Sequence, residues 1–319
     1  MAQEMQQVVS VSRRASTQGV RRGRGQVLWQ RIRASIGWYP FIVYNVFIFV
    51  LFNLITWIYL VRTSFYRADL LMPSRWIGLD NFTRMVTDAK LHTALLNTFE
   101  FLLLSVPARS ALALLVAIAV NRKLLGMRFF RAAYFLPVVT AASVLAMIWG
   151  RLFTYRADGP INYLLGLVGI PAQEFLISIT QAMPVVSGMS IWGGFGYTMV
   201  IWLAGLQAIP AELYEAARVD GAEGWRLHWH ITLPLLRPTA AFILVTSTIG
   251  ALQVFAQIYM LTGGGPVNAT TTLVYYLWMQ SFPLGRLGYG SALSLLTFAI
   301  ILLITYIQTR YLRVSEGVY

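Results

Sequence analysis

The sequence predicts an all-α polytopic membrane protein with six transmembrane helices and both termini in the cytoplasm. Its composition is 57% hydrophobic and 12% charged, against about 45–50% apolar and about 25% charged residues in average soluble proteins. It also contains six apolar runs that each reach the roughly 20 residues needed to cross a bilayer. An ordinary soluble globular protein is therefore excluded.

The six apolar runs are well separated along the chain. The first is longer than the core of a signal peptide and no small-residue cleavage site follows it, so we expect it to be retained. Prolines inside the runs, such as Pro40, Pro107 and Pro137, are tolerated in membrane helices when neighbouring groups satisfy the freed carbonyls. The runs are Gly37 to Val61, Ala94 to Val120, Ala132 to Phe153, Met183 to Leu206, Ala240 to Leu261, and Gly290 to Tyr311.

The distribution of basic residues predicts the orientation. With the N-terminus inside, 16 Lys and Arg residues lie on the cytoplasmic side and 8 on the other, as the positive-inside rule requires. The net charge of +13 is thus a sign of topology and not of a nucleic-acid partner. The basic tail 1–36 lacks apolar periodicity and is predicted to be disordered on anionic lipid, and 313–319 is expected to be a cytoplasmic C-terminus.

The connection 207–238 between the fourth and fifth runs is more structured than a passive linker. Pro210 suits a first helical turn, and Glu212 and Glu215 favour the positive N-terminal end of the helix that follows. Gly221 suits a left-handed stop. These features predict the first helix of a helix–turn–helix at the cytoplasmic surface.

A second short helix is predicted directly after this turn. Trp225 and Trp229 share one of its faces, and Pro234 is expected to end it. The pair of helices could rest on the headgroups with its tryptophans as interfacial anchors. Alternatively it is a docking surface, because Ala216 and Ala217 are small enough to let a partner approach closely. The residues alone leave both interpretations open.

The spacing of residues across this connection resembles the EAA motif found in permease subunits of binding-protein-dependent ABC importers. In that family the EAA helices insert into a cleft on the cytoplasmic ATPase subunit. The resemblance implies an ATPase-docking role for Glu215, Ala216, Ala217, Gly221, Ile231, Leu233 and Pro234.

The resemblance also implies the partners of the chain. They are a second permease subunit forming a heterodimer, two cytoplasmic ATPase subunits, an extracytoplasmic solute-binding protein and the lipid bilayer of the bacterial inner membrane. No nucleic acid is expected. The chain has no Gly-x-x-x-x-Gly-Lys-Ser/Thr sequence, so it is not expected to be an enzyme or to bind a cofactor, and ATP and Mg belong to the partner ATPases.

Further segments resemble the first permease subunit of sugar and glycerol-phosphate importers. One departure is Ala256, where an acidic residue is expected after Phe255. The resemblance divides the chain into a first helix with an extracytoplasmic segment over 37–93 and a permease core of five helices over 94–312. The segments are Gly78 to Phe82, Asn97-Thr98, Gly159 to Asn162, Leu261 to Pro266, and Gly288 to Ala292.

Two runs carry residues suited to a carbohydrate path. Sugars stack their C–H faces on aromatic rings and pair their hydroxyls with amides. The same residue types also serve tight helix packing, so both interpretations stay open. The candidates are Trp192, Phe195 and Tyr197 in the fourth run, and Gln253, Gln257 and Tyr259 in the fifth.

Two charged residues, Glu100 and Arg109, lie inside the second run. They are nine positions apart, about half a turn out of phase, so they cannot pair within one helix. Contact with the second permease is expected, with a place on the solute path as the alternative. His228 and His230 point to nearly opposite sides of a helix, so no metal site is expected.

The sequence thus predicts a permease that translocates a sugar or sugar-like solute by alternating access, driven by ATP hydrolysis on other subunits. The rival hypothesis is a self-contained ion-coupled transporter, a class expected to show internal repeats and functional charges near broken helices. The chain shows no clear repeat, and only two charges, Glu100 and Arg109, lie away from the ends of its runs.

Overall fold

The computed structural model describes residues 36–70, 72–121 and 127–312. The chain divides into two units, 1–59 and 60–319, and each is described by itself. The predictions for the basic tail, apart from Ile36, and for 313–319 lie outside the described residues. The described part is mostly helical, as predicted.

The first unit holds most of one long apolar helix. It comprises the turn η1 (Ile36–Trp38), α3 (Tyr39–Phe49), the wide turn η2 (Val50–Leu54) and α4 (Ile55–Ser64), and it is long and apolar enough to cross a membrane from Tyr39 to Ser64. Polar side chains of this helix donate hydrogen bonds to carbonyls four residues earlier in the chain, as Asn45 does to that of Phe41 at 2.8 Å. The first predicted helix is confirmed.

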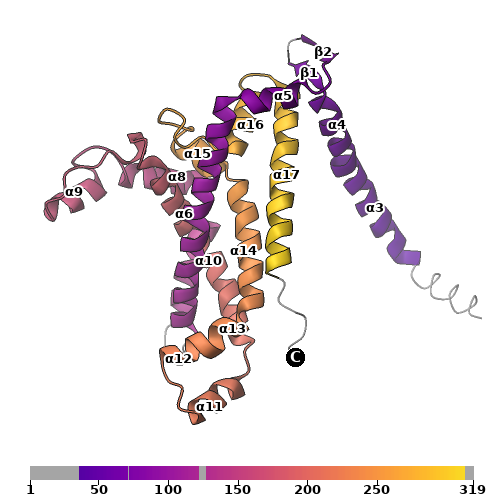
Figure 1. Ribbon diagram of the computed structural model, residues 1–319. Helices are drawn as coiled ribbons and strands as arrows, with labels where there is room; N and C mark the ends of the chain where they lie inside the picture. Colours follow the sequence, from indigo (N-terminus) through magenta and orange to yellow (C-terminus); the bar gives the residue numbers. More distant parts are fainter. Residues whose placement is uncertain (1–35, 71, 122–126, 313–319) are drawn as a thin grey trace, which may run out of the picture. The chain divides into compact units, whose positions relative to one another are not determined.

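Three further long helices in the second unit confirm predicted runs to within a few residues. They are α6 (Ala89–Val120), α10 (Ala182–Gln207) and α17 (Leu287–Tyr311). Figure 1 shows them side by side with α14 (Arg237–Leu252), and Gln308 of α17 donates to Thr248 of α14 at 2.9 Å.

Three buried apolar clusters follow one another along α6, and each joins it to a different combination of neighbouring helices. The cluster near the C-terminal end of α6 contains Ala113, Ala117, Phe195, Met199, Trp202, Leu203, Leu206, Leu236 and Ile243. The middle cluster contains Phe101, Val106, Met183, Val186, Ala251, Val254, Ile258 and Tyr275. The cluster near its N-terminal end contains Met85, Leu91, Ala94, Leu273, Tyr276, Tyr289, Ala292 and Leu293.

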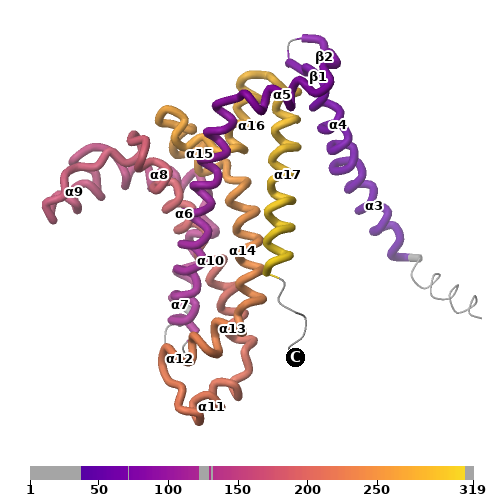
Figure 2. Tube along the Cα trace, in the orientation of Figure 1, coloured from indigo at the N-terminus to yellow at the C-terminus, as the bar shows by residue number. Residues whose placement is uncertain are grey.

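The prediction that the third run forms one continuous helix is wrong. It forms α7 (Met127–Val139) and α8 (Ala142–Leu152), which are bent by 102° (Figure 2). The backbone N–H and the hydroxyl of Thr140 both turn back to carbonyls of α7, and Ala141 is extended with ψ of 138°. Hydropathy does not reveal this break because the residues on both sides of it are mostly apolar.

The fifth predicted run is also interrupted. α14 ends at Leu252, Gln253 to Phe255 leave the helical path, and α15 (Ala256–Leu261) starts anew. At its other end α14 meets the helix Trp225–Leu235 at a bend of 66°. Within the described residues, four helices are long enough to span alone, and up to six spans result if each bent pair counts as one.

The prediction of an all-helical chain misses a β-hairpin. Strands β1 (Tyr66–Asp69) and β2 (Met72–Trp76) pair antiparallel, and α5 (Asp80–Thr87) follows. The hairpin contacts the start of α17 through the N–H of Leu70, which donates to the carbonyl of Gly285 at 3.1 Å. The remaining short helices outside the connection 207–238 are α9 (Pro160–Leu167), η3 (Phe175–Ile177) and α16 (Leu273–Ser281).

Candidate functional site

The connection 207–238 forms the predicted pair of helices at one end of the long-helix bundle (Figure 1). The first is α11 (Ala211–Val219), with Pro210 as its N-cap. Gly221 has a φ of +81°. Its N–H bonds the carbonyl of Arg218 at 3.0 Å while the next N–H bonds that of Ala217 at 2.9 Å, the two bonds of a Schellman stop. The predicted glycine stop is confirmed.

The second helix comprises α12 (Trp225–Leu227), the wide turn η4 (His228–Thr232) and α13 (Leu233–Leu235). The prediction that Pro234 ends it is wrong, because the helix bends only at the next residues, where α14 begins. Pro234 lies in α13, directly after the wide turn η4, in which the N–H of Leu233 bonds the carbonyl of His228 five residues earlier, and the helix continues past the proline.

The two helices are fastened to each other through Thr232, which is 1% exposed. The hydroxyl of Tyr214 on α11 lies 3.0 Å from that of Thr232, and Nδ1 of His228 lies 3.3 Å from the same oxygen. Nδ1 of His230 lies 3.0 Å from the carbonyl of Arg226. The described residues hold no group of three potential metal ligands.

The faces of α11 divide clearly between the protein and its surroundings. Tyr214 is half-buried and Ala217 is buried. At 100° per residue, the opposite face carries Glu215, Ala216 and Val219, and all three are exposed, Val219 at 88%. Of the two alanines in the motif, Ala216 alone therefore faces away from the chain.

The remaining residues of the predicted docking set lie along the second helix. Ile231, Leu233 and Pro234 are half-buried there. On the same helix Trp225 and Trp229 are 69% and 65% exposed. The connection thus presents an acidic and apolar outer surface on an anchored base.

The aromatic candidates of α10 have different surroundings. Phe195 is 3% exposed within the apolar cluster, its ring centroid 6.0 Å from that of Tyr134. Trp192 and Tyr197 are about half exposed. A Cβ on Gly196 would collide with the carbonyl of Tyr134, so close helix packing accounts for this glycine and for Phe195.

The candidates of the fifth run lie at its break. Gln253 is exposed as the cap of α14, and Gln257 is half-buried in α15. Tyr259 is 43% exposed, with ring centroids 5.4 Å from Phe255 and 4.9 Å from Trp278. Trp278 on α16 was missed because the sequence does not show that α16 folds back against α15.

The two charged residues of α6 differ in their partners. Arg109 donates to the hydroxyl of Ser190 on α10 at 2.6 Å, and its guanidinium lies against Gly194, where a Cβ would come within 2.9 Å. Its partner is therefore within the chain. Glu100 is exposed on the surface of α6.

The Asn97-Thr98 segment anchors to α6 the loop 262–272 between α15 and α16, which we call the glycine-rich loop because it contains Gly263 to Gly265. The side-chain amide of Asn97 donates to the carbonyls of Asn268 and Thr271 at 2.8 and 2.9 Å. The hydroxyl of Thr98 accepts the N–H of Leu273 at 2.8 Å. This segment therefore has a structural role that joins residues more than 170 positions apart.

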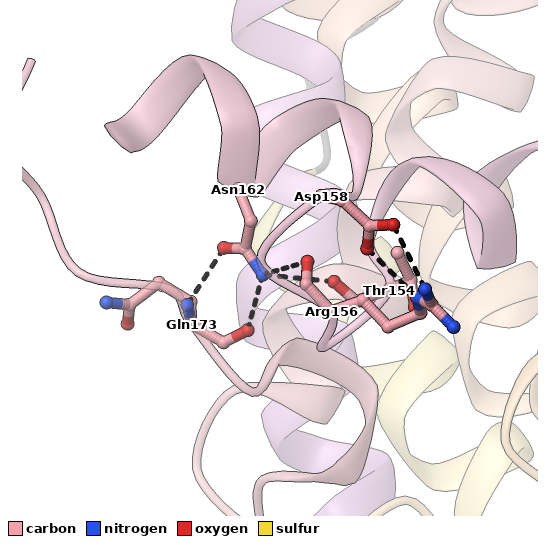
Figure 3. Close-up of polar contacts among 5 residues, drawn as sticks. All are labelled: Thr154, Arg156, Asp158, Asn162 and Gln173. Atoms are coloured by element: carbon pink, nitrogen blue, oxygen red, sulfur yellow. Dashed lines mark hydrogen bonds and ion pairs between the residues drawn. The ribbon is translucent and has the colours of Figure 1, made fainter. Parts of the chain in front are cut away.

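Asn162 has the same kind of role beside α8 (Figure 3). It is 2% exposed, and its amide donates to the carbonyls of Thr154, Arg156 and Gln173 at 2.9–3.2 Å, while its oxygen accepts the N–H of Gln173 at 2.8 Å. Arg156 also pairs with Asp158 at 2.9 Å, and this exposed contact lowers the pKa of the Asp158 carboxyl.

Asp88 joins four elements at the N-terminal end of α6. Its Oδ1 accepts the N–H groups of Lys90 and Leu91, and its Oδ2 accepts the hydroxyls of Tyr276 and Tyr289 at 2.6 Å each. Burial acts to raise the pKa of this carboxyl, but the hydrogen bonds outweigh it, so the pKa lies below its ordinary value.

Residues 27–313 of the chain match the family described as "Binding-protein-dependent transport system inner membrane component". The chain belongs to this family. It is therefore an inner-membrane permease subunit of an ABC importer, and the resemblance carried by the EAA motif is confirmed.

Relatives of known assignment agree with this. The chain is 37% identical over 249 residues to the sn-glycerol-3-phosphate transport system permease protein UgpA of Agrobacterium fabrum, covering 77% of this chain and 84% of that one. It is 34% identical over 254 residues to the trehalose/maltose transport system permease protein MalF of Thermococcus litoralis, covering 79% and 84%. No such relative favours the rival hypothesis of an ion-coupled transporter.

A solved structure shows the same fold. A chain of a bacterial alginate ABC transporter, crystallised with an alginate pentasaccharide-bound periplasmic protein, matches with a TM-score of 0.80 and 23% identity. The match covers 90% of this chain and 97% of that one. The two chains therefore share the same overall fold.

Proposed function

We propose that this permease translocates a sugar or sugar-like solute by alternating access and that α11 is the helix on which a partner ATPase acts. The observation that carries the proposal is the outer face of α11: Glu215, Ala216 and Val219 are exposed on a helix whose other face is anchored through Tyr214 and Thr232. An exposed valine at 88% in such an anchored helix suits a protein contact.

We propose that each of the two bent pairs forms one span, so that the chain crosses the membrane six times. Both termini and α11 would then lie in the cytoplasm. The bias of basic residues supports this orientation. The chain would pair with a second permease, two cytoplasmic ATPases that bind ATP and Mg, and an extracytoplasmic solute-binding protein, and would itself bind no cofactor. The lack of a phosphate-binding loop in the sequence supports placing ATP on the partners.

The sugar class is proposed from relatives and from residue chemistry together. UgpA and MalF are named for glycerol phosphate and for trehalose and maltose. On this chain Trp192, Tyr197 and Tyr259 keep exposed aromatic surface, and Gln253 and Gln257 offer amides beside the break of the fifth run.

Cysteine cross-linking tests the docking role directly, because the chain contains no cysteine. Ala216→Cys and Val219→Cys on the outer face should cross-link to a cysteine placed in the ATPase cleft. Ala217→Cys, one residue away on the buried face, is the matched control and should not. Equal cross-linking at 216 and 217, or none along α11, would contradict the docking role.

A transport assay tests coupling. Glu215→Lys should leave the protein in the membrane at normal level but abolish ATP-dependent uptake, because it reverses an exposed charge on the proposed contact face. Glu223→Lys, a charge reversal at another exposed glutamate in the turn after α11, should retain uptake. Full uptake by Glu215→Lys would refute the coupling role.

The solute path needs a separate test. Tyr259→Ala should lower uptake of the solute, selected by thermal-shift screening of the partner binding protein with a sugar panel, while assembly with the ATPases is unchanged. Tyr163→Ala, which removes a 61% exposed tyrosine from α9, is the control. Normal uptake by Tyr259→Ala would remove this tyrosine from the path.

A further inference from the structure

A polar cavity of about 740 Å³ lies at the end of the long-helix bundle opposite α11. It is open to the surroundings and is lined by the hairpin β1–β2, α5 and the start of α17. Four arginines from these separate elements line it: Arg67, Arg75, Arg84 and Arg286. We call it the arginine cavity. From the sequence, these arginines are predicted only to lie on the outer side of the membrane, because no local pattern indicates that positions 67 and 286 meet.

The arginine cavity has an excess of positive charge, because its four arginines face only two aspartates among the lining residues. Asp69 and Asp80 also line it, yet the ion pair found among the described residues, Arg156–Asp158, lies elsewhere. Arg67 and Arg75 are directly opposite each other in the antiparallel register, and like charges in that position are unfavourable. A fold that keeps this pairing gains from an anion placed between them.

Two of the arginines are held in place by neighbours that leave their charge available. The guanidinium carbon of Arg84 lies 4.3 Å from the ring centroid of Tyr289. Arg286 donates to the Oε1 atom of Gln280 at 3.3 Å. Neither contact supplies a negative charge, so both guanidinium groups keep donors for a ligand.

The walls of the arginine cavity are fixed by buried contacts. The amide of Asn81, 6% exposed, donates to the carbonyls of Ser64 and Tyr66 at 2.7 and 3.0 Å. Gly288 packs so closely on the carbonyl of Tyr66 that a Cβ would collide with it. The hydroxyl of Tyr289 is bonded to Asp88. The backbone that carries the exposed arginines is therefore held in place without a ligand, which favours affinity.

We propose that the arginine cavity binds the oxyanion group, a phosphate, sulfate or carboxylate, of a small ligand. Guanidinium groups bind such groups with paired, charge-assisted hydrogen bonds, and the volume lies within the range of about 300–1,000 Å³ usual for small-molecule sites. The proposal uses no residue of α11 and does not depend on the docking role proposed above.

Two sources offer this chemistry, a free anionic solute and the headgroup of an anionic lipid. A second hollow of about 420 Å³ adjoins the arginine cavity, with Asp69, Met72 and Arg286 common to both, and it is lined by Leu70 and Phe282 to Leu284. An acyl chain would fit beside these apolar side chains, whereas a free solute would leave them uncovered. The experiment therefore has one arm for each source.

The first arm is calorimetric titration of the purified full-length protein in uncharged detergent with inorganic phosphate and with glucuronate, using glucose as the neutral control. The second arm is native mass spectrometry after addition of phosphatidylglycerol or phosphatidylcholine. Both are repeated with Arg67→Gln/Arg75→Gln, with Arg286→Gln, and with Arg151→Gln as an exposed arginine outside the cavity.

We expect saturable binding of at least one anionic probe and none of its neutral counterpart. The affinity should fall with added salt and by about tenfold for each cavity arginine removed, with Arg151→Gln unchanged. Binding of phosphate or glucuronate assigns a solute, and selective retention of phosphatidylglycerol assigns a lipid. Lack of saturable anion binding in both arms, or binding that the cavity variants leave unchanged, overturns the proposal.

The variants themselves should fold. Arg67 and Arg75 are exposed on a hairpin, and removing their charges relieves repulsion between them. The melting temperature of Arg67→Gln/Arg75→Gln should therefore equal or exceed that of the unaltered protein without ligand, so loss of binding with an unchanged melting temperature reports on the site and not on unfolding.

Discussion

The substitution Asp88→Asn tests the junction of α5, α6, α16 and α17. The two oxygens of Asp88 have separate tasks: Oδ1 caps α6 through Lys90 and Leu91, and Oδ2 accepts both tyrosine hydroxyls. Asparagine caps a helix about as well as aspartate. However, the substitution replaces Oδ2 with an NH₂ group, so the hydroxyls of Tyr276 and Tyr289 would face a donor in place of their acceptor.

The expected loss follows from these contacts. Hydrogen bonds to charged groups contribute about 1.5–3 kcal/mol each. Asp88 is only half-buried, so water replaces part of each bond, and we expect the free energy of unfolding to fall by about 2–4 kcal/mol. Tyr276→Phe, which removes one of the two bonds, should give about half of this loss.

The effect of pH has a definite sign. The pKa of Asp88 is lowered in the folded protein. Its contribution is therefore complete above the unfolded value of about 3.9 and is lost as pH falls through the lower folded value. The difference in unfolding free energy between Asp88→Asn and the unaltered protein should be constant between about pH 7 and 5 and shrink below about pH 4.

The assay is unfolding of the purified protein from mild detergent by dodecyl sulfate, followed by tryptophan fluorescence. Asp158→Asn is the matched control, because its carboxyl also has a lowered pKa and a partner but lies fully exposed, and it should leave stability unchanged. An Asp88→Asn protein as stable as the unaltered one at pH 7, or a difference that persists unchanged at low pH, would refute this account of the junction.

Three further predictions concern helix packing and the motif amides. Gly196→Ala should destabilise the protein by about 1–3 kcal/mol because its Cβ meets the carbonyl of Tyr134, whereas Gly250→Ala, with open space around it, should not destabilise; equal effects in the same unfolding assay would exclude the packing argument. Asn97→Ala leaves two carbonyls without their donor and should cost about 1–3 kcal/mol, with faster proteolysis of the glycine-rich loop; unchanged proteolysis would argue against anchoring. Asn162→Ala should likewise expose the chain on either side of α9 to hydrogen exchange, which protection at the unaltered level would contradict.

The long helices could be predicted from the sequence and the breaks could not. Hydropathy located α6, α10 and α17 to within a few residues because a membrane helix is defined by its apolar length. The bends near Thr140 and Gln253 depend on backbone conformations within apolar surroundings. A composition window does not detect them, although each decides which side chains face the interior of the fold.

The functional surfaces also combine features that the sequence predicts with features that it does not. Pro210 and Gly221 marked the ends of α11 because each acts through its own backbone. The opposite orientations of Ala216 and Ala217 follow from where Tyr214 meets Thr232, a contact across 18 positions. The arginine cavity assembles residues from 67 to 286, and no local pattern carries that information.

The anchoring of α11 also has a mechanical consequence for the coupling proposed above. Thr232 fixes α11 to the helix Trp225–Leu235, and at the bend into α14 lies Leu236, 1% exposed in the cluster shared by α6, α10 and α14. Displacing α11 without α14 would break the contact at Thr232 or open that close-packed cluster, and either is costly. Under the proposed coupling, movement of α11 by a partner would therefore reach α14 through this contact, and α6 and α10 through the cluster.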